Sequence, residues 1–463
     1  MVWAPRIQKG QTMQRSTGLL LVSALALSTA ACGSGSEPAT PSAAGSAPPV
    51  SITVACQPAK SAPKERQAWD DDVATFTKEH PGVTVKSTDQ QPCFDPKTFG
   101  PKLAGGQMET AFVVPVTNYA DVITKGQALD ITSYTSEIKN WNDLRPDHKE
   151  LVTKDGKVYG VPNVHYSVGL VYNRALFTKA GLDPENPPKT WAEVREAAKK
   201  IAGLGAGFVG YGEYSGGNTG GWHFTQALYG RGGDILTPDN KQAAFNSAEG
   251  KAVLQTLHDM RWVDDSMGTK LLVGWESLMV AMGSGKVGMM LGAPDVVTDV
   301  VTKFKGNVAD YGITGFPEAK ASLSGGEAFM INPKATPEEA KAALAWIDFR
   351  FNTVGKGRFD FARGKSIGNP VGVPDNAVFG DSPTGQAIQA DRVKNASLPV
   401  ANYDSYAQAA GTVPPKAEPP YAQELYAILD VAMSGVLSRK DASIDQLLTD
   451  AETKANSVLA AKG

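Results

Sequence analysis

Hydrophobic positions follow two different patterns along this chain, and together they predict an α/β fold. Short apolar runs typical of β-strands lie at residues 51–55, 83–87, 112–116 and 288–292. Between residues 64 and 80 apolar positions recur instead at helical spacing, with Trp69, Val73 and Phe76 on one face. Strands that alternate with amphipathic helices in this way indicate the α/β class.

Two helix starts are marked by capping boxes, in which a Thr hydroxyl accepts from a backbone N–H and a Glu three residues later reaches back. Thr190 with Glu193 forms one box, and Thr336 with Glu339 forms the other, with Pro337 at the first helical position. Two further helices are expected near the C-terminus, at residues 422–437 and 444–459.

The first 31 residues have the pattern of an export signal and are not expected to belong to the fold. A basic segment with Arg6, Lys9 and Arg15 precedes a short apolar run and small residues that lead to Cys32. Met1 and Met13 are alternative translation starts, and the sequence leaves the choice between them open. The Ala-Ala-Cys sequence resembles a bacterial lipobox, although Thr29 stands where that pattern usually has Leu, Val or Ile. Lipidation of Cys32 is expected, with plain secretion as the alternative, and residues 32–49 are expected to form a flexible tether.

Net charge, cysteine positions and histidine spacing indicate which partners, disulfides and metal sites to expect. The net charge of −3 becomes more negative when the three basic signal residues are removed, which argues against nucleic acid as a partner. Cys56 ends one predicted strand and Cys93 follows the next. Because neighbouring parallel strands place their carboxyl ends side by side, the two can form a disulfide; the alternative is two unrelated thiols. The five histidines show no metal-binding spacing.

Several segments, in the correct order, resemble the bacterial extracellular solute-binding proteins, family one. The strongest are Gly156–Pro162, Val171–Leu182 and Pro188–Glu193, and weaker matches follow at 232–235, 282–289, 311–317 and 325–331. The resemblance implies an α/β, two-lobe fold of the periplasmic-binding-protein type II, with a ligand cleft between the lobes. Crossings of the hinge are expected near 164–169, 311–314 and 349–354. Lobe one would hold residues 50–165 and 313–351, and lobe two 166–312 and 352–463.

The same resemblance implies the function of a binder. The chain is expected to capture a mono- or oligosaccharide by hinge closure and to deliver it to the permease of an ABC importer. It would act as a monomer outside the cytoplasm, anchored to the cell membrane by lipid alone, without a cofactor, a metal or catalysis. A non-sugar solute, such as a polyamine or a glycerophosphodiester, is the alternative. A glycoside hydrolase that uses the carboxyl groups of Asp295 and Glu327 is a more distant alternative.

Sugars pack their C–H faces on aromatic rings and need several hydrogen-bonding groups for their hydroxyls. Trp222, at the end of the glycine-rich segment 214–222, is therefore the first candidate, with a core position as its alternative. Tyr166 in the first crossing is the second, with His165 on the opposite side of an extended strand as the other choice. Asp295 either contacts the ligand or caps a helix. Glu327 either contacts the ligand or forms an ion pair. The further ligand candidates are Gly326, Asn118, Tyr119, Gln57, Trp275 and Tyr421.

Overall fold

The computed structural model describes residues 49–89, 93, 96–215, 219–374 and 378–462. The expected signal segment, nearly all of the expected tether and Cys32 lie outside these residues, as does part of the glycine-rich segment before Trp222. None of the helices in the described residues is both long enough and apolar enough to cross a lipid bilayer.

Residues 48–463 form one compact unit that contains two main β-sheets. The first sheet has the strand order β12-β11-β3-β1-β2, and β6 also pairs with β11. Its β1, β2 and β3 are parallel, whereas β11 runs antiparallel to both β3 and β6. The strands are β1 (Val50–Gln57), β2 (Val83–Asp89), β3 (Ala111–Pro115), β6 (Gly160–Ser167), β11 (Ser322–Ile331) and β12 (Pro415–Lys416).

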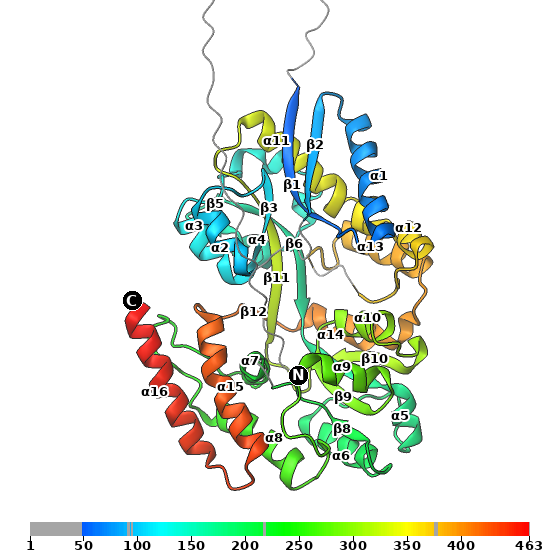
Figure 1. The fold of residues 1–463 in the computed structure, drawn as a ribbon, viewed down its shortest axis with the longest axis vertical. Coiled ribbons are helices and arrows are strands. Elements are labelled where there is room, and N and C mark those ends of the chain that lie inside the picture. The colour runs from blue at the N-terminus through cyan, green and yellow to red at the C-terminus, as the bar shows by residue number, and fades with distance from the viewer. Residues whose placement is uncertain (1–48, 90–92, 94–95, 216–218, 375–377, 463) are drawn as a thin grey trace, which may run out of the picture. The chain divides into compact units, whose positions relative to one another are not determined.

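Both faces of the first sheet are covered, which explains why its central strand β3 is apolar along its length, whereas the edge strand β2 alternates apolar and polar residues. On one face Val113 packs with Trp69 and Trp346, and on the other Phe112 packs with Tyr119. We call this sheet and its helices the first lobe (upper half of Figure 1). The helices are α1 (Pro63–Glu79), α2 (Pro96–Ala104), α3 (Tyr119–Thr124), α4 (Pro146–Leu151) and α11 (Pro337–Ile347), and a small hairpin adds β4 (Thr153–Lys154) and β5 (Lys157–Val158).

The second sheet has the strand order β10-β7-β9-β8 and forms the core of what we call the second lobe. Its strands are β7 (Gly169–Asn173), β8 (Val209–Tyr211), β9 (Val287–Gly292) and β10 (Tyr311–Gly315). Leu170 and Val171 of β7 face different clusters of buried side chains, so this sheet is also covered on both sides. Its helices are α5 (Arg174–Lys179), α6 (Trp191–Ala202), α7 (Gly220–Gly230), α8 (Ala248–Trp262), α9 (Trp275–Gly283), α10 (Asp295–Thr302), α14 (Asp404–Thr412), α15 (Ala422–Ser438) and α16 (Ile444–Lys462).

Two long strands connect the lobes. β6 and β11 pair along Ser324–Met330 and run side by side from the first lobe towards the second (Figure 1). Leu323 at the start of β11 already belongs to the second lobe's core, and its N–H donates to Gln226 Oε1 at 2.6 Å. β6 leads directly into β7. The chain therefore passes between the sheets near Ser167 and again near Ser324.

The packing differs from the expected lobe boundaries at two places. β10 pairs with β7 from Tyr311 to Gly315, so the second crossing lies after these residues and not at 311–314. The chain also stays with the first lobe after residue 352, because its next two helices pack there. Phe361 and Ile388 share a cluster with Leu144, and the Thr384 hydroxyl donates to Asp143 at 2.6 Å. These helices are α12 (Phe361–Ile367) and α13 (Pro383–Lys394).

The helices and strands that local signals in the sequence predict are present in the structure. The predicted strands match β1, β2, β3 and β9, and the predicted helices match α1, α15 and α16 within a few residues. Both capping boxes are present, at Thr190 for α6 and at Thr336 for α11. Cys56 and Cys93 are joined in a disulfide, with their Cα atoms 4.5 Å apart.

Candidate ligand-binding site

The start of helix α7 is fixed against helix α15, and this contact sets the position of Trp222. The Gly220 N–H donates to Asp430 Oδ1 at 2.8 Å. Gly221 lies so close to α15 that a Cβ there would collide with the backbone of Tyr426. Glycine is therefore required at this contact, and the next residue, Trp222, is held at a defined place in the second lobe.

Trp222 lines a cavity of about 350 Å³, which we call the aromatic cavity. Its volume is near the lower end of the range for small-molecule sites, which is roughly 300–1,000 Å³. Five of the lining residues are aromatic, two are acidic, and five are polar-neutral or small. The lining consists of Tyr166, Tyr214, Trp222, Trp275 and Tyr426, of Asp295 and Glu418, and of Thr219, Gln423, Gly292, Ala293 and Val296.

The rings of the aromatic cavity support one another. Tyr214 meets Trp275 edge to face, with centroids 5.0 Å apart and planes at 74°. Tyr214 also packs against His223 at 4.0 Å, and Trp222 packs against the same imidazole at 5.1 Å. His223 is buried and contacts the buried carboxylate of Glu213. This contact fixes His223, which in turn limits the rotation of the two rings that face the cavity.

The two carboxylates of the aromatic cavity lie in poorly solvated positions. Burial raises the pKa of Glu418 to about 7, and the Trp222 indole opposes that effect as a hydrogen-bond donor. Burial also raises the pKa of Asp295, and Asp299 adds to the effect. Basic side chains close to them in sequence are engaged elsewhere. Lys303 pairs with Asp299 at 2.8 Å, and Lys416 pairs with Asp234.

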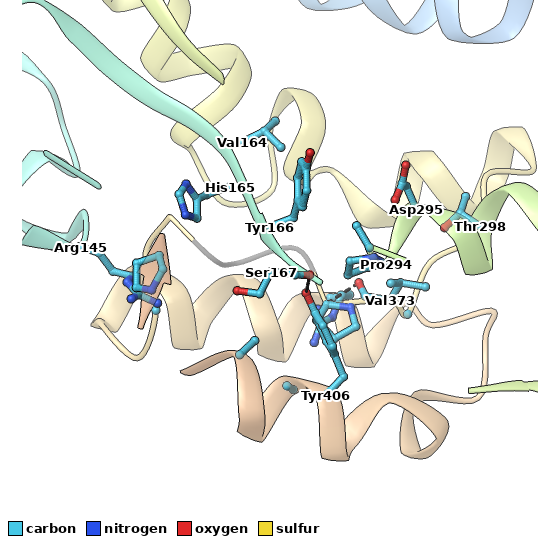
Figure 2. Close-up of a pocket in the computed structure, with 18 of the residues that line it drawn as sticks. Arg145, Val164, His165, Tyr166, Ser167, Pro294, Asp295, Thr298, Val373 and Tyr406 are labelled. Carbon is cyan, nitrogen blue, oxygen red and sulfur yellow. Dashed lines mark hydrogen bonds between the residues drawn. The ribbon is translucent and has the colours of Figure 1, made fainter. Parts of the chain in front are cut away.

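A second cavity of about 480 Å³ lies next to the aromatic cavity and is lined by both lobes; we call it the interlobe cavity. Tyr166, Ala293 and Asp295 line both cavities. Other residues of the interlobe cavity include Arg145, His148 and Phe361 from the first lobe, Thr298 and Tyr406 from the second, and Val164, His165 and Ser167 from β6. Figure 2 shows Tyr166 on the side of β6 that faces Asp295.

Strand β6 is held to both neighbours at this place. The Tyr406 hydroxyl donates to the Ser167 carbonyl at 2.7 Å (Figure 2). Tyr166 lies across Gly325 of β11, where a Cβ would collide with the Tyr166 hydroxyl. A side chain at Gly325 would therefore displace the one aromatic ring that lines both cavities.

Comparison with known proteins agrees with this architecture. The family profile of the bacterial extracellular solute-binding proteins matches residues 61–353. This chain belongs to that family. A binding protein of Brucella abortus (strain 2308) is 27% identical over 212 residues, which are 44% of this chain and 49% of that protein. The chain thus spans about half the length of the curated relatives it matches.

Solved structures of two-lobe solute-binding proteins share the fold. The cyclic α-maltosyl-1,6-maltose binding protein from Arthrobacter globiformis is similar with a TM-score of 0.67 and 22% identity, over 89% of this chain and 99% of that one. UgpB from Mycobacterium tuberculosis, in complex with glycerophosphocholine, is similar with a TM-score of 0.67 and 16% identity, over 90% of this chain and 100% of that one. At these identities the likeness shows the fold alone.

The structure of this solute-binding protein brings four of the ten candidate ligand residues together. Trp222, Tyr166, Trp275 and Asp295 all line the aromatic cavity. Pro294 occupies the N-cap position of α10 and Asp295 is the first helical residue, but the Asp295 carboxylate accepts hydrogen bonds from the backbone N–H groups of Asp295 and Val296. The helix-capping alternative for Asp295 therefore stays open beside ligand contact.

His165, the alternative to Tyr166, has other partners. Its ring packs against His148 in a tilted arrangement with centroids 3.6 Å apart, and its Nε2 contacts the Ser324 hydroxyl. Burial lowers the pKa of His165 to about 3 and that of His148 to about 4, so both imidazoles are neutral at physiological pH. Figure 2 shows His165 and Tyr166 on opposite sides of β6, as the alternation of an extended strand requires.

The other six candidates lie outside the described lining of both cavities. Gln57 is buried and donates to Asp70 at 3.1 Å, and Tyr119 is a buried core residue. Gly326 faces the β6 backbone, where a Cβ would collide with the Val164 carbonyl. Tyr421 is exposed and precedes α15 in a left-handed conformation. Asn118 and Glu327 are half-buried, and burial raises the pKa of Glu327 while Arg358 opposes it.

Sequence reasoning missed the roles of Tyr214, Glu418 and Tyr426 as lining residues. Tyr214 begins the glycine-rich segment that indicated Trp222, so its position was a usable signal. Glu418 precedes two prolines and lies only three residues before the candidate Tyr421. Nothing local marks it as a cavity residue, because the cavity is assembled from segments more than 190 residues apart in sequence.

Proposed function

We propose that this protein is the solute-binding component of an ABC importer and that it captures a small carbohydrate between its lobes. The observation that carries the proposal is that two neighbouring cavities share Tyr166, Ala293 and Asp295 in their linings. The aromatic cavity belongs mainly to the second lobe, while the adjoining interlobe cavity is lined by both lobes. A solute that extends from one cavity into the other would contact both lobes at once.

The aromatic cavity has the two kinds of surface that a sugar needs. Trp222, Trp275 and the tyrosines offer flat faces for C–H groups. Asp295, Glu418, Gln423 and Thr219 offer acceptors and donors for hydroxyls. The cavity volume of about 350 Å³ favours a small solute over a long oligosaccharide.

Closure of the lobes would couple binding to transport. A ligand shifts a two-state equilibrium by the difference between its affinities for the two states. Groups from the first lobe, such as Arg145 and His148, line only the interlobe cavity. They would contribute contacts only when the lobes approach each other, and this difference favours the closed state. The permease would then bind the closed form.

The cellular setting completes the proposal. Export by the N-terminal signal and lipidation of Cys32 would place the protein outside the cytoplasm, on the membrane surface, as a monomer. The segment 33–49 would let the folded unit reach the permease, since a chain of that length has an r.m.s. end-to-end distance of roughly 20–25 Å. Mass spectrometry of the Cys32 region in wild type and Cys32→Ala tests the anchor.

Replacement of Trp222 by Ala tests the site. Trp222→Ala should weaken carbohydrate binding by at least about tenfold, equivalent to about 1.4 kcal/mol, because it removes one ring face and the donor to Glu418. Isothermal titration calorimetry over a panel of mono- and disaccharides measures the effect, and a panel read by thermal shift selects the sugars to titrate.

Trp262→Ala provides a matched control. Trp262 is another partly buried tryptophan of the second lobe, and its indole donates to the Val436 carbonyl at 2.9 Å, away from both cavities. This variant should keep the wild-type affinity. Equal affinity of Trp222→Ala and wild type would remove the aromatic cavity from solute binding.

A non-sugar solute is the second candidate, favoured by the two carboxylates in the cavity. Polyamines belong in the same panel for that reason, and glycerophosphodiesters are included as the other non-sugar alternative. The distant alternative of a glycoside hydrolase with Asp295 and Glu327 has less support, because Glu327 lies outside the described lining. Hydrolysis of aryl glycosides by the protein would support the glycoside hydrolase alternative.

A further inference from the structure

The aromatic cavity has an unusual balance of charge for a site that binds neutral sugars. Of its described lining residues, two are acidic and none is Lys, Arg or His. No ion pair of Asp295 or Glu418 is found among the described residues. Lys303 lies close enough to oppose the rise in the pKa of Asp295, but it pairs with Asp299, and Lys416 pairs with Asp234. The cavity therefore holds two carboxyl groups that have no ion-pair partner among the described residues.

The aromatic rings of the cavity are also free of protein cations. Elsewhere in the chain Arg231 lies 4.6 Å from the Trp191 centroid, and Lys416 lies 4.7 Å from the Tyr229 centroid. Within the described residues no Lys or Arg lies over any of the five rings that line the cavity. Their faces can accept a cation from a ligand.

Carboxylates and ring faces that share one cavity recognise the same chemical group. An ammonium or quaternary ammonium group is attracted to the negative face of an aromatic ring, most strongly to Trp. It also restores the favourable interactions that a carboxylate loses when it leaves water. A neutral sugar satisfies carboxylates by hydroxyl donors, but it does not compensate their negative charge when they are ionised.

We propose that the aromatic cavity binds the ammonium group of a small hydroxylated solute, held between the faces of Trp222 and Trp275 and the carboxylates of Asp295 and Glu418. The inference rests on the proposed solute-binding function and specifies its substrate class. Two sources supply this chemistry: an amino sugar, in which the ammonium replaces a ring hydroxyl, and a choline-type headgroup on a polyol.

Matched pairs of probes separate the charge from the shape of the solute. We would titrate the intact folded protein by calorimetry with glucosamine and glucose, and with choline and its uncharged isostere 3,3-dimethyl-1-butanol. The cationic member of at least one pair should bind at least about tenfold more tightly than its neutral partner. Preference within the first pair assigns an amino sugar, and preference within the second assigns a choline-type headgroup.

Charge-removing variants test whether the cavity itself gives this preference. Asp295→Asn and Glu418→Gln should each reduce the ratio of cationic to neutral affinity by at least about threefold. Glu276→Gln removes an exposed carboxylate next to Trp275 that does not line the cavity, and it should keep the wild-type ratio. Circular dichroism and thermal melting confirm that each variant is folded.

The outcomes distinguish this inference from the proposed function. A neutral sugar that binds as tightly as its cationic partner, with loss of binding in Trp222→Ala, would reject the ammonium site and keep the solute-binding function. Absence of binding by both cationic probes at millimolar concentration would reject the ammonium site as well. No binding by any cation, sugar or phosphodiester in the panel would reject both.

Discussion

Glu418 should make the folded protein less stable at neutral and alkaline pH, and its replacement by Gln should remove that cost. An ordinary glutamate has a pKa of 4.5, whereas burial raises the pKa of Glu418 to about 7. The raised value means that the folded state binds this proton more tightly than the unfolded state. The stabilising effect of the proton is therefore complete below pH 4.5 and is lost as the pH rises through about 7.

The size of the effect follows from the two pKa values. One pKa unit corresponds to about 1.4 kcal/mol, so ionisation of Glu418 in the folded state costs about 3 kcal/mol in the limit. Structural relaxation and water entry reduce the cost, and we expect Glu418→Gln to exceed wild type in free energy of unfolding by about 1–3 kcal/mol at pH 8. Below pH 4.5 the two proteins should differ little, because both side chains are then neutral.

Urea denaturation of both proteins at pH 4.5, 6 and 8 measures this difference. Glu424→Gln is the control, since it removes an exposed carboxylate from the same region of the chain. A gap between wild type and Glu418→Gln that stays constant from pH 4.5 to pH 8, or that favours wild type at pH 8, would refute the reasoning. The same ionisation makes a second measurement informative: a cationic ligand should bind more tightly as the pH rises from 5 to 8.

Two further predictions concern the framework of the first lobe. Loss of the disulfide in Cys56→Ser/Cys93→Ser should lower the free energy of unfolding by about 2–4 kcal/mol, because the bond closes a segment with a sequence separation of 37; an unchanged denaturation midpoint would contradict this. Asp72→Ala should cost about 3–5 kcal/mol, because this buried carboxylate pairs with Arg363 at 2.7 Å and with Arg350 at 3.0 Å. Among the described residues, Arg350 would lose its carboxylate partner, and Arg363 would keep only Asp360 at 3.5 Å. Exposed Asp71→Ala is its control, and equal denaturation curves for the two variants would show that the pairing is not stabilising.

The helices and strands that the sequence predicts are those with local signals. A capping box, an apolar run or a helical stripe acts within about one turn of helix or one strand, and Thr190, Thr336 and the α1 face are examples. The lobe boundaries depend instead on distant contacts. Thr384 stays with the first lobe because its hydroxyl donates to Asp143, 241 residues away, and no local pattern encodes that bond.

The site shows the same division between local and distant information. Trp222 and Tyr166 could be predicted, because each lies in a segment with a recognisable pattern. Glu418 could not be predicted, because the side chains around it come from three other elements. Helix α7 and strand β6 are remote from it in sequence, and α15 is the next element along the chain. Its raised pKa arises only when those elements enclose it. Residues whose chemistry depends on enclosure are the ones that sequence patterns miss.

The position of Tyr166 connects the binding chemistry to the movement of the lobes. It is the aromatic residue that lines both cavities, and it lies on β6 where the chain passes between the sheets. Gly325 and Gly326 on the neighbouring strand β11 have no side chains, so β6 can approach β11 closely. The Tyr406 hydroxyl donates to the Ser167 carbonyl of β6. A solute that packs against Tyr166 therefore contacts the connecting strand itself. In the proposed closure of the lobes, binding energy gained at this ring would act directly on the connecting segment.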